Sequence, residues 1–176
     1  RGRVNDSIVF SYGAGQYYEL LPKAGNESSL LSSPGQNDTS IISMSGVIYK
    51  DGNFIKTGAG ITVLNSRLSL DVDTADYSYN GELVILEGTF NTMGYDVRVN
   101  HIDFSDDILY TELNISNSHL FLHGSNDHTF NQLDSLIAGS SVIDFDPFDN
   151  EQCFIQLNEH SYGTIKLRDH SYIYGE

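Results

Sequence analysis

The sequence contains no tryptophan, one cysteine and three prolines among its 176 residues. Because one cysteine cannot pair within the chain, a fold held by internal disulfides is excluded, and the apolar neighbours of Cys153 predict a buried side chain. No apolar run approaches the roughly 18 residues that a membrane-spanning helix needs, so we expect no membrane insertion. The missing tryptophan leaves tyrosine as the side chain for stacking on sugars, with these candidates: Tyr77, Tyr79, Tyr172 and Tyr174.

Basic residues are also scarce. Nine lysines and arginines face 24 aspartates and glutamates, which gives a formal net charge of −15 at pH 7. An acidic surface without a basic stripe repels phosphate backbones and anionic lipid, so we expect neither nucleic acid nor a membrane surface as a partner. The charge favours partners that are cationic, neutral or bridged by a divalent metal.

Helical periodicity is nearly absent from the chain. It is confined to residues 16–21, which Pro22 ends, and to residues 129–137. The remaining apolar residues alternate with polar ones in short runs separated by Asn, Asp, Ser and Gly, which is typical of strands and turns. We expect strands at residues 45–49, 60–64, 68–70, 83–86, 96–99, 111–115, 118–122, 141–143, 154–157, 164–167 and 171–174.

The strand lengths and spacing favour one all-β architecture over two others. A sandwich requires hairpin turns, but Asp51-Gly52 and Asn80-Gly81 are the only Asp-Gly or Asn-Gly pairs in the sequence. A closed barrel requires longer strands than these. Strands of three to five residues with polar corners suit a right-handed parallel β-helix (β-solenoid), in which each coil stacks on the last. No exact repeat is visible. We expect residues 45–176 to form the solenoid and residues 1–44 to form an irregular N-terminal cap or joining segment.

Two stretches of the chain are similar to a known repeat. Residues 90–100 (FNTMGYDVRVN) and 111–118 (TELNISNS) resemble a pattern in large cell-surface proteins of Bacteroidota, which include the gliding-motility adhesins exported by the type IX secretion system. Glu112 stands where that pattern has Arg, and the Trp that often closes the repeat is missing. The resemblance implies a secreted, non-catalytic cell-surface adhesin or filament segment, with neighbouring domains in a larger chain and surfaces or glycans as ligands.

The same resemblance implies modification of hydroxyl side chains. Bacteroidota attach O-linked glycans at Asp-Ser or Asp-Thr followed by a small or branched apolar residue, and three sites fit: Ser7, Thr74 and Ser135.

The spacing Asp-x-Asp-x-x-Asp occurs twice. Carboxylates two residues apart project to one side of an extended segment, and a turn can bring the third round, so oxygen ligands could converge on Ca²⁺. A solvated acidic turn is the favoured interpretation of both stretches and a calcium site is the alternative; no cofactor is required. The candidate ligands are Asp71, Asp73, Asp76, Asp144, Asp146 and Asp149.

His119 and His123 flank Phe121 with a separation of four residues. On a strand this spacing puts the two imidazoles on one face but roughly 13 Å apart, too far to share a metal ion. We therefore expect surface histidines.

Two other functions remain open. Parallel β-helices also carry polysaccharide lyases and hydrolases, which need a base and cations or a carboxylate pair. Acids are abundant here, but the cations Arg98, Lys166 and Arg168 are isolated in the sequence, so we expect no enzyme. A trimeric, phage-type tail fibre is the remaining alternative.

Overall fold

The computed structural model describes residues 7–12, 29–42, 53–70, 81–104, 109–124, 128–147, 152–168 and 171–175. These residues form short strands and one 3-10 turn, with no α-helix among them. None of the described segments is a helix long and apolar enough to cross a membrane.

All strand pairs are parallel, and they build four sheets. Sheet A contains β1 (Ser7–Tyr12), β2 (Ser29–Pro34), β4 (Phe54–Lys56), β7 (Glu82–Ile85) and β10 (His101–Phe104). Sheet B contains β3 (Thr39–Ile42), β5 (Ile61–Leu64), β8 (Gly88–Asn91), β11 (Thr111–Asn114) and β14 (Ser135–Ile137). Sheet C contains β6 (Leu68–Ser69), β9 (Val97–Val99), β12 (His119–Leu122), β15 (Val142–Phe145) and β17 (Thr164–Leu167). Sheet D contains β13 (His128–Thr129), β16 (Cys153–Leu157) and β18 (Ser171–Gly175).

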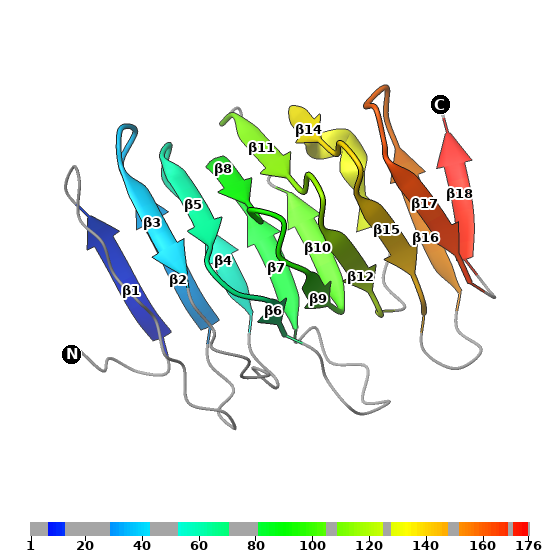
Figure 1. Cartoon of the computed structure of the whole chain (residues 1–176), viewed down its shortest axis with the longest axis horizontal. Helices are drawn as coiled ribbons and strands as arrows, with labels where there is room; N and C mark the ends of the chain where they lie inside the picture. Colours follow the sequence, from blue (N-terminus) through cyan, green and yellow to red (C-terminus); the bar gives the residue numbers. More distant parts are fainter. Residues whose placement is uncertain are drawn as a thin grey trace.

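The chain visits the sheets in rotation, so each turn of the chain is one coil of a solenoid. β7, β8 and β9 make one coil, and β10, β11 and β12 make the next, lying beside it in the same order. β10 contacts β13, so sheet D continues the wall that sheet A begins. Successive coils follow one another along the long axis from β1 to β18 (Figure 1). The parallel β-solenoid expected from the sequence is therefore confirmed.

Solenoid pairing already includes residues before 45. β2 pairs with β4, and β3 pairs with β5, in the same parallel registers that the later coils use. The expected boundary between residues 44 and 45 lies outside the described residues.

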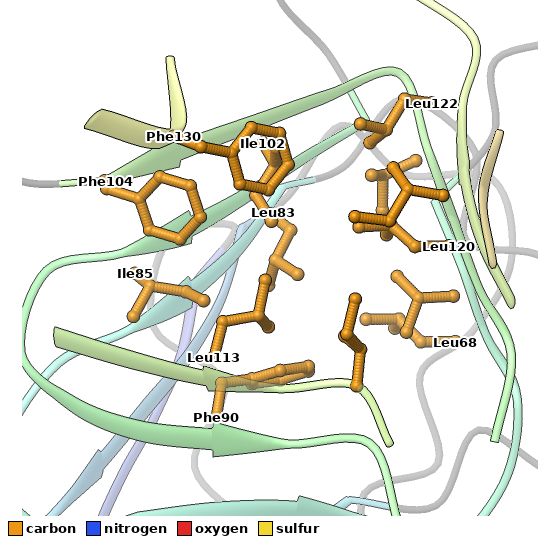
Figure 2. Packing of buried hydrophobic residues seen from close by; sticks show 14 of the residues in the cluster. Leu68, Leu83, Ile85, Phe90, Ile102, Phe104, Leu113, Leu120, Leu122 and Phe130 are labelled. Atoms are coloured by element: carbon orange, nitrogen blue, oxygen red, sulfur yellow. The ribbon is translucent and has the colours of Figure 1, made fainter. Parts of the chain in front are cut away.

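Alternation along each strand places every second side chain inside. Val97, Leu120 and Ile143 are register neighbours in three successive coils of sheet C, and all three are buried. Figure 2 shows Phe90 and Leu113 facing Leu83 and Ile102 across the interior. Because every coil adds one layer to the same columns, the core is continuous along the solenoid.

A turn that recurs every 23 residues joins sheet B to sheet C. In each case a backbone N–H donates to the carbonyl three residues before it: Tyr95 to Thr92, Ser118 to Ile115 and Ser141 to Ala138, at 2.9, 3.0 and 3.0 Å. Positive φ angles occur inside all three turns, at Met93 and Gly94, at Asn117 and at Gly139. The three turns thus share a hydrogen bond but differ in which central residue has a positive φ, so no single residue pattern marks the repeat in the sequence.

The helix expected at residues 129–137 is wrong. Residues Phe130–Gln132 form a single 3-10 turn, after which β14 runs extended and pairs with β11, with Leu136 beside Leu113. Pairing with the preceding coil satisfies the backbone of this short segment better than an isolated helix of the same length would. The other expected helix, at residues 16–21, lies outside the described residues.

Candidate functional site

The outward face of sheet C carries the most organised group of polar side chains among the described residues. Arg98, Phe121, Asp144 and Lys166 are register neighbours in four successive coils. They point away from the core because they alternate with the buried column of Val97, Leu120 and Ile143. We call the following set the sheet C array: Arg98, His119, Phe121, His123, Asp144, Asp146, Lys166 and Arg168.

An ion pair between neighbouring coils lies at the centre of the array. The Arg168 guanidinium binds the Asp144 carboxylate in a two-pronged geometry, with Nε–Oδ1 and Nη2–Oδ2 distances of 3.1 Å each. Asp144 is only 2% exposed, and Arg168 Nη1 also lies 3.5 Å from Asp146 Oδ2. Two parallel N–H···O bonds fix the orientation of the two side chains relative to each other, in addition to pairing their charges.

This pairing keeps Asp144 ionised. The hydrogen bonds from Arg168 lower the pKa of the Asp144 carboxyl, and the charge of Arg168 lowers it further, against the opposing effect of burial. The same contact raises the pKa of Arg168. Asp144 is therefore a fixed negative charge, and it is a poor proton donor near neutral pH.

A row of aromatic rings runs along β12. The Phe121 ring stacks with the His119 ring, with centroids 3.6 Å apart, and also with the His123 ring, with centroids 6.2 Å apart. His119 Nε2 lies 3.5 Å from Asp144 Oδ2, and His123 Nδ1 lies 3.7 Å from Asp146 Oδ2. The expectation that both histidines share one face of a strand is confirmed, but their rings lie closer together than the expected 13 Å, and both side chains are half-buried.

Cations that are isolated in the sequence lie on one face of the solenoid. Arg98 and Lys166 belong to the same column, with Phe121 and Asp144 between them, and Arg168 follows two residues after Lys166. The array therefore combines three cationic groups with two carboxylates. One of the cations, Arg168, contacts both carboxylates. Its groups suit the hydrogen bonding of hydroxyl or carboxylate oxygens along an extended ligand.

Arg168 was not among the candidate site residues expected from the sequence. It lies 24 residues after Asp144, which is the 22 residues to the register partner Lys166 in the next coil plus two further residues. A search for opposite charges at separations of 22–24 residues would have found this pair, once the coil length was known.

The candidate calcium ligands are only partly described. Asp144 and Asp146 are two residues apart and both contact Arg168, so a guanidinium occupies the position in which a cation would neutralise them. Asp71, Asp73, Asp76 and Asp149 lie outside the described residues. Within the described ranges, no group of three or more His, Cys, Asp or Glu side chains is arranged to hold a metal ion.

The candidate glycosylation residue Ser135 takes part in contacts between coils. Its hydroxyl donates to Glu112 Oε2 at 3.2 Å, and the neighbouring Asp134 accepts the backbone N–H of Thr111 at 2.7 Å. Glu112 also accepts hydrogen bonds from the Thr89 and Tyr110 hydroxyls, so the carboxylate at this position joins side chains of three coils. Thr74 and the side chain of Ser7 lie outside the described residues.

Cys153 is buried, at 1% exposure, as its apolar neighbours predicted. It pairs in register with Ser171 and belongs to the inward side of β16. Cys153 is therefore a core residue.

No known family, curated protein sequence or solved structure matches this chain. Inferences about its function therefore depend on the geometry of its own residues.

Proposed function

We propose that the chain is a non-catalytic segment of a secreted bacterial cell-surface protein, of the kind used for adhesion or gliding, and that it attaches to glycans or other surfaces. The sheet C array carries this proposal. Its outward side chains stand on strands that repeat every 4.8 Å or so, so an extended polymer could contact one coil after another. A continuous core beneath them keeps that spacing rigid.

The chemistry of the array favours oxygen-rich ligands. Lys166 is exposed, so its ammonium can present N–H groups to hydroxyls or carboxylates while its stem stays on the sheet. The ion pairs around Asp144 hold the neighbouring side chains in place before a ligand arrives, which lowers the entropic cost of binding.

The ion pairs also support a binding role over hydrolysis. Glycoside hydrolysis needs one carboxyl with a raised pKa as a general acid and a second, ionised carboxylate. Arg168 contacts both Asp144 and Asp146 and lowers the pKa of Asp144, which is the opposite of what a general acid requires.

The proposal is tested by retention on polysaccharides. The chain should be retained on cellulose, chitin or polygalacturonate, measured by sedimentation with the insoluble polymers and by affinity electrophoresis with the soluble one. Lys166→Gln should weaken retention several-fold. Arg67→Gln, which removes an equally exposed cation outside the array, should leave it unchanged. No retention on any of the three polymers would overturn the proposal.

A polysaccharide lyase is the second candidate, because the array places cations beside a histidine–carboxylate pair. In such a reaction a base such as His119 would take the proton from C5 of a uronate, electrons would form the C4–C5 double bond, and the C4–O bond would break. The cations would neutralise the substrate carboxylate. Ultraviolet absorbance of the unsaturated product, measured with polygalacturonate, tests this directly, and clear turnover would overturn the non-catalytic proposal.

A further inference from the structure

A second group of outward side chains lies on sheet D, away from the sheet C array. Alternation along β16 puts Cys153 and Ile155 inside and Phe154 and Gln156 outside. β18 pairs with β16 so that Tyr172 lies beside Phe154 and Tyr174 lies beside Gln156. We call Phe154, Tyr172 and Tyr174 the aromatic triad.

The two tyrosines are exposed but held in place. Tyr172 is 43% exposed and Tyr174 is 57% exposed. The Phe154 ring packs against both, with centroid distances of 5.7 Å to Tyr172 and 5.4 Å to Tyr174, and with interplanar angles of 30° and 44°. Contact with a half-buried ring restricts both phenols, so less rotamer entropy remains to be lost on binding.

We propose that the aromatic triad and Gln156 form a binding site for neutral pyranose sugars. The C–H face of a pyranose ring is apolar and packs on aromatic rings, while its hydroxyls need donors and acceptors at the edge. Tyrosine hydroxyls and the Gln156 amide supply both. Two tyrosines separated by one residue are about 7 Å apart along a strand, so one sugar unit can cover both rings.

Charge and size point to this class of ligand. The outward side chains of the described strands here are Thr129, Phe154, Gln156, Tyr172 and Tyr174, and none carries a charge. An anionic sugar would gain no ion pair at this site and would be repelled by a chain of net charge −15. A protein partner, including a second copy, normally needs about 20–30 residues a side, far more than this group provides.

The choice of sugars as the ligand rests on the proposed attachment function, but the site itself is independent of the sheet C array. The full chain should bind at least one neutral hexasaccharide among cellohexaose, chitohexaose, xylohexaose and mannohexaose, measured by isothermal titration calorimetry. Saturation-transfer NMR should show the contact through the sugar ring protons. Hexagalacturonate should not bind at this site.

Matched variants locate the binding. Tyr172→Ala with Tyr174→Ala should weaken affinity about tenfold or more, because both stacking surfaces are lost. Tyr172→Phe with Tyr174→Phe should keep affinity within about threefold, since the rings remain. Tyr95→Ala removes a tyrosine of 40% exposure on a distant turn and should change nothing. Unchanged circular dichroism and melting of each variant exclude unfolding as the cause.

Three results would overturn the inference: no binding of any of the four sugars, equal binding by the double alanine variant, or self-association that this variant abolishes without any sugar binding. Lys166→Gln separates the two proposals, because it should weaken retention on polygalacturonate through the sheet C array and leave binding of the neutral hexasaccharides unchanged. Binding of a neutral hexasaccharide combined with no retention on polygalacturonate would overturn the sheet C proposal alone.

Discussion

At the scale of single residues, the described part of the solenoid encloses two ionisable side chains with no exposed surface, Lys56 and His128. Lys56 is fully buried, and its ammonium donates to the carbonyl oxygens of Thr57, Gly58 and Glu87, while burial lowers its pKa to about 8. His128 is also fully buried, beside His101 and Phe145. Burial, and next the charge of His101, lower its pKa to about 3. Lys56 is satisfied by three acceptors, whereas His128 is kept neutral.

The neutral state of His128 predicts instability in acid. Its ordinary pKa is 6.5, so below this pH the unfolded chain binds a proton that the folded chain refuses until about pH 3. Stability present above pH 6.5 is therefore lost as the pH falls through this window. Between pH 7.5 and pH 5 the free energy of unfolding should fall by about 2 kcal/mol from this residue alone.

Urea unfolding of the native chain and of His128→Leu at both pH values checks this prediction. Leucine has a similar size and does not titrate, so the variant should lose about 2 kcal/mol less than the native chain between the two pH values. Equal losses in the two proteins would show that His128 contributes nothing to the acid sensitivity.

At the scale of elements, strands and turns of neighbouring coils depend on one another. β15 and β17 are joined by backbone pairing and also by the Arg168–Asp144 ion pair on their outward side. Removing only one partner leaves the other without compensation, and for the buried Asp144 carboxylate this is costly.

Arg168→Gln should therefore lower the melting temperature by several degrees, whereas the same change in an Asp144→Asn background should lower it much less. Thermal melts of the four proteins form a double-mutant cycle that isolates the coupling between the two side chains. Arg67→Gln serves as the control, because Arg67 is exposed and lies outside the sheet C array. Additive effects in the cycle would contradict the role assigned to the pair.

The recurring turn between sheets B and C contains a strained residue. Met93 has a φ of 53°, in the left-handed region that costs a residue with a Cβ about 1–2 kcal/mol. Glycine removes this strain but adds freedom to the unfolded chain. Met93→Gly should therefore raise the free energy of unfolding by about 0.5–1 kcal/mol in urea titrations.

Asn117 provides the matched control for this prediction. It lies in the equivalent turn one coil later, at the position that Gly94 takes in the first turn, with a φ of 62°, and asparagine tolerates that conformation. Asn117→Gly should change stability by only a few tenths of a kcal/mol. A loss of stability in Met93→Gly would mean that the methionine side chain contributes more than its backbone costs.

At the scale of the whole molecule, inward side chains of successive coils stack in columns along the solenoid axis. How deeply a side chain is buried depends on whether coils cover it on both sides. Ile155 and Ile173 are register neighbours on the inward side of β16 and β18. Ile155 is 0% exposed because coils lie on both sides of it, whereas Ile173 is 42% exposed in the last described strand. The same residue type in one column thus occupies two environments.

The two isoleucines should respond differently to truncation. Ile155→Ala should cost about 2–5 kcal/mol of unfolding free energy, because it removes buried methyl groups and leaves a cavity. Ile173→Ala should cost less than about 1 kcal/mol, since water already reaches this side chain. Urea unfolding at constant pH measures both, and equal costs would contradict the column description.

Much of this architecture could be predicted from local sequence. Alternation in Val97-Arg98-Val99 and in Leu120-Phe121-Leu122 determines strands with one apolar face, and short strands with polar corners determine a solenoid more readily than a sandwich. Residues 129–137 were misleading because three apolar residues at helical spacing are also compatible with a turn followed by a strand. Pairing of β14 with β11 favours the turn and strand over the helix. That pairing involves residues 23 positions earlier in the chain, which local sequence does not reveal.

The candidate sites depended on the tertiary structure. The sequence by itself determined which side chains alternate outward, such as Phe121, Asp144 and Tyr172, because alternation is a property of neighbouring residues. It did not determine which of them meet. Arg168 reaches Asp144, and Phe154 reaches Tyr172 and Tyr174, only because each coil has a particular length and register. Backbone pairing between coils determines that register, and it brings residues 18 to 29 positions apart into contact.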